Sequence, residues 1–344
     1  MSVALDKQTH TFLAQYFNND QIKIHQLAGD ASARKYYRII HDQDTYVLMS
    51  WLPFDAEKYP FIDVLKHFEL AGIHVPKIKK IGAELGLILL EDLGDLTLER
   101  KFWESSQQEL SWHFYKKSLD EIIKIHTQAT QLKQKTIAKD IMFDTAKFMW
   151  EMNYAKEHLI EGVLKFDLKS PSRKELSIQL DKTLLDICEK LHDEPKVICH
   201  RDYHSRNLMI KLDNIFVIDF QDARLGPIQY DLVSLIKDSY VDINDQYAEK
   251  MIDYYLDHTD FLRIQKKSKD QFYYIYEIQS IQRCLKACGS FSSFMNTRQD
   301  RRYLKYLAPT LKRVMRSLTH FPEYKPLLNV LVDAGAFEKT YEQL

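Results

Sequence analysis

A polar octapeptide between apolar segments is the feature that most constrains how this chain can fold. Residues 200–207 read H-R-D-Y-H-S-R-N, and a further aspartate, Asp219, follows the apolar run at 215–218. Short runs rich in Ile and Val are typical of buried strands. The spacing therefore predicts a loop that leaves one strand and a hairpin that returns beside it, so that Asp202, Asn207 and Asp219 lie together.

Two carboxylates and an amide at this spacing have the composition of a phosphoryl-transfer site. Such a site needs a metal ion on the phosphates and an oriented acceptor hydroxyl, with little covalent help from the protein. We expect Asp202 to orient and deprotonate the hydroxyl, and Asn207 and Asp219 to bind Mg²⁺ through hard oxygen ligands. We expect His200 to hold the loop. The alternative is a polar turn in which these residues only support the backbone.

The chain before residue 92 has β-type patterning around one long helix, and the chain after it is mostly helical. In the first part, strands are expected at 21–27, 35–41, 45–51, 77–81 and 85–91, and helices at 4–17 and 55–71, with Gly72 as a C-terminal cap. Later helices are expected at 112–131, 145–164, 173–192 and from 229 onward, with strands at 196–199, 208–211 and 215–218. We therefore predict an α+β fold of two lobes, a small antiparallel sheet over 1–92 and a mainly helical lobe over 93–344.

Composition excludes several classes of function. With 344 residues the chain is long enough for about two domains and a cleft between them. A formal net charge of -1 argues against a nucleic-acid or membrane surface over the whole chain. No apolar run approaches the ~20 residues of a membrane span, and the first residues lack the pattern of a signal peptide. Four cysteines without a Cys/His metal set are expected as buried thiols of a cytoplasmic protein. The oligomeric state stays open.

The octapeptide is part of a longer pattern. With I-D-F at 218–220 and L-G-P-I-Q-Y-D-L at 225–232, it resembles the aminoglycoside-phosphotransferase and choline-kinase group of protein-kinase-like enzymes. His204 stands where protein kinases have a lysine, as it does in the small-molecule kinases of this group. The order of strands and helix before residue 92 is also that of a kinase small lobe. The resemblance implies that Asp231 braces the catalytic loop; a solvated helix N-cap is the alternative.

Four further segments are similar to one subgroup of that family, the anomeric sugar kinases of bacterial cell-wall recycling. They read G-D-A-S-A-R-K-Y-Y-R at 29–38, L-L-E-D-L-G-D at 89–95, D-F-Q-D-A at 219–223 and Q-R-C-L-K-A-C-G at 282–289. The resemblance covers most of the chain, from about residue 29 to residue 311. It implies that ATP is the phosphoryl donor and that the acceptor is the C1 hydroxyl of N-acetylmuramate or N-acetylglucosamine.

The nucleotide is expected to lie against the first lobe. Small residues between the first two strands would let backbone N–H groups approach phosphate oxygens, although an ordinary hairpin turn fits as well. These residues are Gly29, Asp30, Ala31 and Ser32. Backbone groups around Glu91 and Leu93 would bind the adenine, although a buried strand end gives the same pattern. The choice between ATP and GTP stays open there.

The third strand departs from the kinase pattern. Kinases place a lysine there that pairs with the α- and β-phosphates, whereas this chain has Met49. Arg34 and Arg38 are possible substitutes, because strand alternation puts them on one face and Lys35 on the other. A solvated charged face is the alternative.

The acceptor is expected to carry a negative charge. Between residues 282 and 320, nine basic residues accompany a single acid, Asp300. That excess suits a sugar carboxylate better than a polycationic aminoglycoside. Most of this run is expected on a solvated helix surface, with Arg283 and Lys286 as the exceptions that meet the sugar. The further acceptor-binding residues that we predict are Glu151, His204, Arg206, Gln221 and Asp222.

The sequence thus predicts an ATP- and Mg²⁺-dependent kinase of an N-acetylated amino sugar in peptidoglycan recycling. Two alternatives stay open. One is another small-molecule kinase of the same fold, acting on an aminoglycoside, choline or fructosamine. The other is a pseudokinase that binds nucleotide and serves as a scaffold, an interpretation that Met49 favours. The preferred sugar and the anomeric stereochemistry are not fixed by the sequence.

Overall fold

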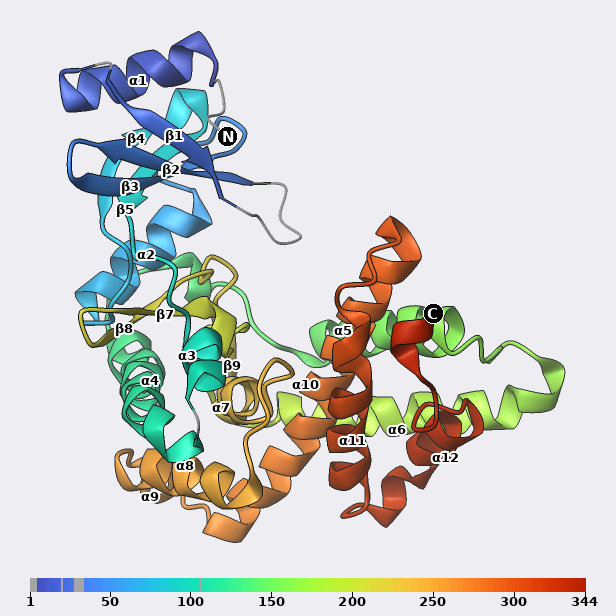
Figure 1. Ribbon diagram of the computed structural model, residues 1–344. Coiled ribbons are helices and arrows are strands. Elements are labelled where there is room, and N and C mark those ends of the chain that lie inside the picture. The colour runs from blue at the N-terminus through green and yellow to red at the C-terminus, as the bar shows by residue number, and fades with distance from the viewer. Residues whose placement is uncertain (1–4, 20, 28–33, 106) are drawn as a thin grey trace.

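The fold is described from a computed structural model, and the described residues are 5–19, 21–27, 34–105 and 107–344 (Figure 1). A β-rich lobe lies at one end of the molecule, and helices build most of the remainder. The predicted α+β class, a small antiparallel sheet followed by a mainly helical part, is confirmed. We keep residues 92/93 as the proposed lobe boundary. The predicted phosphate loop at 29–32 lies outside the described residues.

Five antiparallel strands form the sheet of the first lobe, in the order β1-β2-β3-β5-β4. They are β1 (Lys23–Gln26), β2 (Lys35–His41), β3 (Asp44–Ser50), β4 (Ile78–Gly82) and β5 (Leu87–Glu91). Alternation along the strands sends side chains to two faces. Leu48 packs with Phe12 of α1 (Lys7–Phe17) in one cluster, whereas Met49 and Leu90 belong to a larger cluster with α2 (Pro60–Leu70). The sheet therefore carries α1 on its outer face and turns its other face toward α2 (Figure 1).

Both helices of this lobe begin later than predicted, for local reasons. α1 starts after Asp6, whose carboxylate accepts the N–H of Thr9 at 2.9 Å as an N-cap. α2 starts at Pro60 and not at residue 55, because proline fixes its own φ and lacks an N–H, which suits the first helical position. Gly72 has φ +74° and donates its N–H to the carbonyl of Glu69, as predicted for the end of this helix.

Helices dominate the second lobe. They are α3 (Leu98–Glu104), α4 (Trp112–Lys124), α5 (Thr145–Ala155), α6 (Lys174–His192), α7 (Gln229–Ile236), α8 (Asp245–Asp257), α9 (Phe261–Ile264), α10 (Lys269–Arg298), α11 (Leu307–Leu318) and α12 (Lys325–Asp333). Two predicted helices end in π-helical turns, α4 at Ile125–Ala129 and α5 at Lys156–Val163. Such turns are frequent near functional sites. The long α10 runs from the neighbourhood of α9 to that of α5 and α11 (Figure 1).

Two short strand pairs carry the octapeptide. β6 (Lys196–Cys199) ends directly before it and pairs with β9 (Arg224–Pro227). β7 (Leu208–Lys211) follows it and pairs with β8 (Asn214–Val217). The N–H of Ile218 donates to the carbonyl of Asn207 at 3.0 Å, so the chain after β8 returns beside the octapeptide. The predicted loop and hairpin are therefore confirmed.

Two predictions concern the whole chain. All four cysteines are buried free thiols, as predicted. Burial raises the pKa of the Cys188 and Cys199 thiols, which keeps them protonated at neutral pH. In the part of the chain that the structure describes, no helix has the length and apolar character needed to cross a membrane.

Candidate active site

A cleft of about 870 Å³ is lined by residues of both lobes. On the side of the sheet its wall includes Tyr36, Val47 and Leu90, and on the helical side it includes residues of α5, α7 and α10. Clefts of this size hold drug-sized ligands, and apolar walls with a few polar groups are typical of them. Asp202, Asn207 and Asp219 all line this cleft, so the octapeptide and the hairpin meet at one place.

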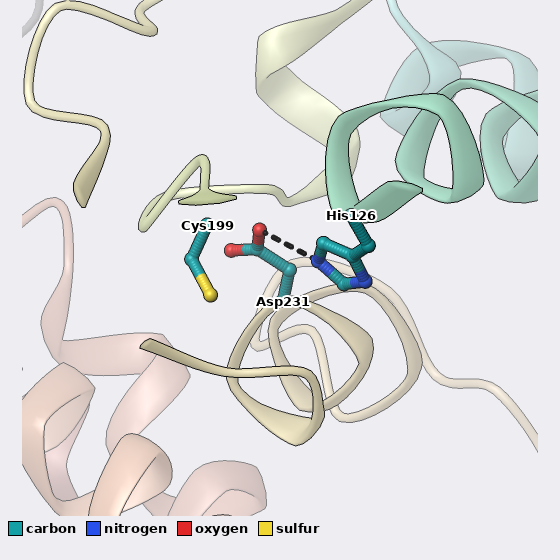
Figure 2. Close-up of side chains that lie close together, drawn as sticks. All are labelled: His126, Cys199 and Asp231. Carbon is teal, nitrogen blue, oxygen red and sulfur yellow. Dashed lines mark hydrogen bonds and ion pairs between the residues drawn. The ribbon is translucent and has the colours of Figure 1, made fainter. Parts of the chain in front are cut away.

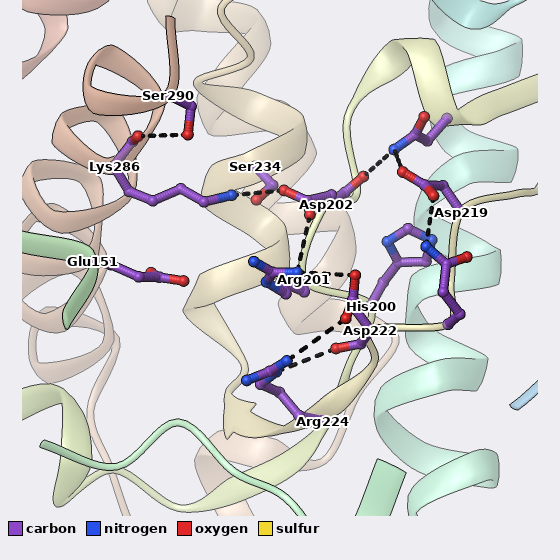
Figure 3. Close-up of polar contacts among 12 residues, drawn as sticks. Glu151, His200, Arg201, Asp202, Asp219, Asp222, Arg224, Ser234, Lys286 and Ser290 are labelled. Carbon is purple, nitrogen blue, oxygen red and sulfur yellow. Dashed lines mark hydrogen bonds and ion pairs between the residues drawn. The ribbon is translucent and has the colours of Figure 1, made fainter. Parts of the chain in front are cut away.

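Hydrogen bonds hold these three residues in a fixed relation, and Figure 3 shows Asp202 and Asp219 on either side of the link. The side-chain amide of Asn207 donates to the backbone carbonyl of Asp202 at 2.9 Å and to Oδ2 of Asp219 at 3.4 Å. The backbone N–H of His204 donates to the same carbonyl of Asp202 at 3.0 Å. The side chain of Asn207 therefore ties the loop to Asp219.

The site also concentrates unusual backbone geometry and oxygen donors. Arg201 has φ +85° and Asp219 has φ +62°, conformations that non-glycine residues adopt at a cost and that recur at active sites. Oδ2 of Asp219 accepts the hydrogen bond from Asn207, and its Oδ1 accepts one from Nε2 of Gln221 at 2.8 Å. An exposed carboxylate beside an amide oxygen is a donor set that fits Mg²⁺.

Asp231 lies beneath the octapeptide and supports its first residues. Its Oδ2 accepts the N–H of His200 at 2.6 Å, and its Oδ1 accepts the N–H of Arg201 at 2.9 Å. Nε2 of His200 in turn donates to the carbonyl of Ile218 at 2.9 Å. Asp231 is fully buried in the first turn of α7, not in a solvated cap. These bonds link α7, the loop and the segment that ends in Asp219.

His126 and Cys199 complete a buried cluster with Asp231 (Figure 2). The imidazole of His126 contacts Oδ2 of Asp231 at 3.3 Å and the hydroxyl of Tyr255 at 2.8 Å. The thiol of Cys199 donates to the carbonyl of Pro227 at 3.4 Å. Because both oxygens of Asp231 already accept backbone N–H groups and the thiol is protonated, we interpret the cluster as a hydrogen-bonded brace and not as a metal site.

Cations surround the carboxylate of Asp202. Its Oδ1 accepts a hydrogen bond from Nζ of Lys286 at 2.8 Å and from Nη2 of Arg283 at 3.4 Å, and Nη1 of Arg201 lies 3.9 Å from its Oδ2. Burial alone would raise the pKa of Asp202, but these three cations lower it well below its usual range. Burial lowers the pKa of the neighbouring His204 to about 3, so that ring is neutral at pH 7. Asp202 is therefore charged at neutral pH and is a weak base.

Most of the predicted acceptor-binding residues lie along the same cleft. Arg206, whose guanidinium stacks 3.8 Å from the ring centroid of Tyr240, forms a bidentate pair with Glu99 at 2.9 Å. Asp222 binds Nη1 of Arg201 at 3.1 Å and is not among the residues that line the cleft. Arg283 donates to the hydroxyl of Ser234 at 2.8 Å.

Glu151 differs from these residues because one of its oxygens is buried without a partner. Its Oε2 accepts hydrogen bonds from Gln282 at 2.9 Å and from the hydroxyl of Tyr230 at 3.3 Å. Its Oε1 has no hydrogen-bond partner among the described residues, although the side chain is only 1% exposed and lines the cleft. A buried carboxylate oxygen left in this state favours a ligand that donates a hydrogen bond.

On the nucleotide side, Arg38 is paired with two carboxylates, which the sequence did not predict. It makes paired hydrogen bonds with Asp92, the shorter at 2.6 Å, and with Asp95, the shorter at 2.9 Å. Two carboxylates neutralise its charge, which does not favour a phosphate contact. Arg34 lies beside Tyr36 and Tyr59.

The segment predicted to bind the adenine, around Glu91 and Leu93, and the third strand complete the nucleotide side. Glu91 and Leu93 line the cleft, and the carboxylate of Glu91 binds Nζ of Lys211 at 2.7 Å. Met49 is fully buried in the core beside α2. At the position of the kinase lysine, the strand therefore contributes packing and no charge.

Several residues that shape the site escaped the sequence analysis. Asp238 accepts the N–H of Ser205 at 2.8 Å and so fixes the far end of the octapeptide, and Glu99 holds Arg206. Asp92 and Asp95 lie in the segment L-L-E-D-L-G-D at 89–95, but their pairing with Arg38 joins segments more than 50 residues apart. Hydrophobic periodicity carries no signal for such long-range polar pairs.

Comparisons with known proteins agree with this geometry. The family model described as "Phosphotransferase enzyme family" matches residues 23–265. A protein of Neisseria meningitidis serogroup B named N-acetylmuramate/N-acetylglucosamine kinase is 29% identical over 308 residues, which cover 89% of this chain and 89% of that protein. A protein of the same name from Pseudomonas aeruginosa is 27% identical over 307 residues, covering 88% of this chain and 86% of its own.

Solved structures with the same fold are more distant in sequence. The streptomycin-ATP-APH(2")-IIa ternary complex superimposes with a TM-score of 0.59 at 13% identity, covering 92% of this chain and 97% of that one. The choline kinase LicA from Streptococcus pneumoniae gives a TM-score of 0.56 at 13% identity, covering 92% and 100%. At these identities the likeness concerns the fold alone, and it confirms the predicted kinase-like architecture.

Proposed function

The chain belongs to the phosphotransferase enzyme family and is an ATP-dependent phosphotransferase, and from that premise we propose that its acceptor is the C1 hydroxyl of N-acetylmuramate or N-acetylglucosamine. The observation that carries this proposal is the meeting of Asp202, Asn207 and Asp219 on one cleft beside a group of cations. The names of the relatives from two bacteria support the amino sugar. The enzyme would then act in the recycling of peptidoglycan.

The site has a group for each requirement of phosphoryl transfer. Asn207 and Asp219 would hold Mg²⁺, which neutralises charge on the phosphates when bound. The segment around Glu91 and Leu93 would bind the adenine, and Arg34 is the protein cation that we propose nearest the phosphates. Asp202 would accept a hydrogen bond from the attacking hydroxyl and orient it toward the γ-phosphorus. It would take the hydroxyl proton as the new oxygen–phosphorus bond forms and the bond from the γ-phosphorus to the β,γ-bridging oxygen breaks, which releases ADP.

The character of Asp202 supports an acidic acceptor hydroxyl. A carboxylate that three cations stabilise is a weak base, so it is poorly matched to an ordinary alcohol. The hydroxyl of a hemiacetal, such as C1 of a free reducing sugar, is more acidic than that of an ordinary alcohol. Glu151 would accept a hydrogen bond from another hydroxyl or an N–H of the sugar through its unpartnered Oε1.

Cationic acceptors fit this wall less well. An aminoglycoside or choline would bring positive charge toward Lys286, Arg283 and Arg201, which already share one carboxylate. The carboxylate of N-acetylmuramate would instead be attracted to them. Met49 favours a pseudokinase, but the arrangement of Asp202, Asn207 and Asp219 favours catalysis.

A panel of acceptors scored by ADP release tests this proposal. The panel contains N-acetylmuramate, N-acetylglucosamine, choline and an aminoglycoside, each with Mg²⁺ and ATP. We expect turnover of the two amino sugars and at most background with the cationic acceptors. Turnover confined to choline or the aminoglycoside would contradict the assigned substrate class, and absence of transfer to every hydroxyl compound would support the pseudokinase.

A further inference from the structure

One feature of the cleft is not explained by metal or nucleotide binding, namely the ammonium group that contacts the carboxylate of Asp202. Nζ of Lys286 lies 2.8 Å from Oδ1, and the Lys286 side chain is 13% exposed (Figure 3). In the part of the chain that the structure describes, Oδ2 accepts no hydrogen bond. Oδ1 is therefore held by hydrogen bonds, whereas Oδ2 lies 3.9 Å from Nη1 of Arg201 and can still accept a hydrogen bond from a ligand.

We propose that Lys286 is a positioning residue for the transfer, which fixes Asp202 through Oδ1 so that Oδ2 alone meets the acceptor hydroxyl. The proposal rests on the proposed function in one respect, the assignment of Asp202 to the acceptor. Asp202 is free to rotate about its side-chain bonds unless something holds it, and misplacement of a reacting group by about 1 Å can cost 100-fold in rate. A charge-assisted hydrogen bond supplies that restraint.

The helix that carries Lys286 is itself anchored where it passes α5. A Cβ atom built on Gly289 would lie 2.6 Å from Cα of Ala155, so only glycine allows this close approach of the two helices. Lys286 is three residues before Gly289 and therefore on the same side of α10. The backbone of α10 is thus held against α5 one turn from the ammonium group.

Polar bonds on both sides of Lys286 strengthen this anchor. Gln282 of α10 donates to Glu151 of α5 at 2.9 Å, and Arg283 of α10 donates to Ser234 of α7 at 2.8 Å. The segment Q-R-C-L-K-A-C-G at 282–289 therefore supplies bonds to α5, bonds to α7, the glycine contact and the lysine. Together these contacts fix the part of α10 from which the ammonium group of Lys286 reaches Asp202.

A restraint of this kind predicts a change in the acid–base behaviour of Asp202. Burial lowers the pKa of Lys286, but its attraction to Asp202 opposes that shift. If Lys286 is replaced by Met, Asp202 loses a cation that stabilises its charged form, so its pKa rises. Since the variant then takes up its proton at higher pH, the acidic limb of activity moves to higher pH as well.

The first test needs no acceptor and no turnover. The enzyme is prepared with ¹³C-labelled aspartate carboxyls, the Asp202 resonance is identified by its absence in Asp202→Asn, and the resonance is titrated in wild type, Lys286→Met and Lys286→Arg. We expect the titration to move to higher pH in Lys286→Met and to stay near wild type in Lys286→Arg, which keeps the cation. Unchanged titration in Lys286→Met would overturn the proposal.

The second test separates positioning from binding. With whichever acceptor the enzyme turns over, we expect Lys286→Met to lower kcat by about 10- to 100-fold and to move the acidic limb of kcat/KM upward. A raised KM for the acceptor with unchanged kcat and pH profile would show that Lys286 only binds the acceptor. Lys269→Met, the same change at the exposed start of α10, is the matched control, and Lys286→Gln repeats the test should Met disturb folding.

Discussion

At the scale of single residues, Asp202 is a counter-ion as well as the proposed base. Its carboxylate faces three cations, two on α10 and one in the loop itself. Removal of this acid would leave Lys286 and Arg283 without the carboxylate that they contact. The site would then lose activity and stability together.

We therefore expect Asp202→Asn to reduce turnover by at least ~100-fold and to lower the free energy of unfolding by about 1–3 kcal/mol, because Lys286 and Arg283 are left without their carboxylate. Urea titration measures the second effect and ADP release the first. Asp193→Asn, at an exposed position, is the control for the substitution itself. Increased stability of Asp202→Asn would show that the carboxylate of Asp202 does not stabilise the protein through Lys286 and Arg283.

At the scale of elements, predictions made from regular sequence patterns were correct, whereas features that depart from those patterns were not predicted. β-type patterning correctly predicted the five strands of the sheet, and the spacing of the octapeptide correctly predicted its hairpin. The early start assigned to α2 was wrong because the acidic stretch before Pro60 imitates a helix N-terminus. The pairing of Arg38 with Asp92 depends on the folded sheet meeting the chain after β5, which no local pattern encodes.

The contact of α10 with α5 gives a prediction at this scale. Gly289→Ala should destabilise the protein by about 1–3 kcal/mol, because its Cβ would enter the backbone of α5. Helix propensity alone would instead raise the free energy of unfolding by about 1 kcal/mol. The sign of the change in that free energy therefore decides whether propensity or packing dominates at this position. Thermal or urea unfolding measures it, with Thr297→Ala on the exposed end of the same helix as control. Increased stability of Gly289→Ala would refute the close contact.

At the scale of the whole molecule, the two lobes meet at the cleft that we propose for the nucleotide. The sheet supplies apolar walls, including Val47 and Leu90, while the proposed metal ligands come from the hairpin of the other lobe. Lys211 of that hairpin binds both the carboxylate of Glu91 and the carbonyl of Asp92. These two bonds join the lobes beside the segment predicted to bind the adenine. Nucleotide and metal binding should therefore depend on each other.

Asp219→Ala tests that dependence. In the presence of Mg²⁺ we expect the variant to bind ATP about 10-fold or more weakly than wild type, since a carboxylate ligand of the metal is lost. Without Mg²⁺ the two proteins should bind ATP alike, because the adenine contacts are unchanged. Calorimetric titration with and without the metal measures both. Equal affinities of the two proteins for ATP in the presence of Mg²⁺ would show that Asp219 is not a ligand of the metal.

The position of the transferred phosphate tests the central claim most directly. The enzyme is incubated with Mg²⁺, ATP and N-acetylglucosamine labelled with ¹³C at C1, and the product is examined by ³¹P NMR beside a reaction with the methyl glycoside, which lacks a free C1 hydroxyl. We predict a phosphorus signal split by the labelled carbon, and no transfer to the methyl glycoside. A phosphorylated product without that splitting, or equal turnover of the methyl glycoside, would contradict the assignment of this cleft to the anomeric hydroxyl.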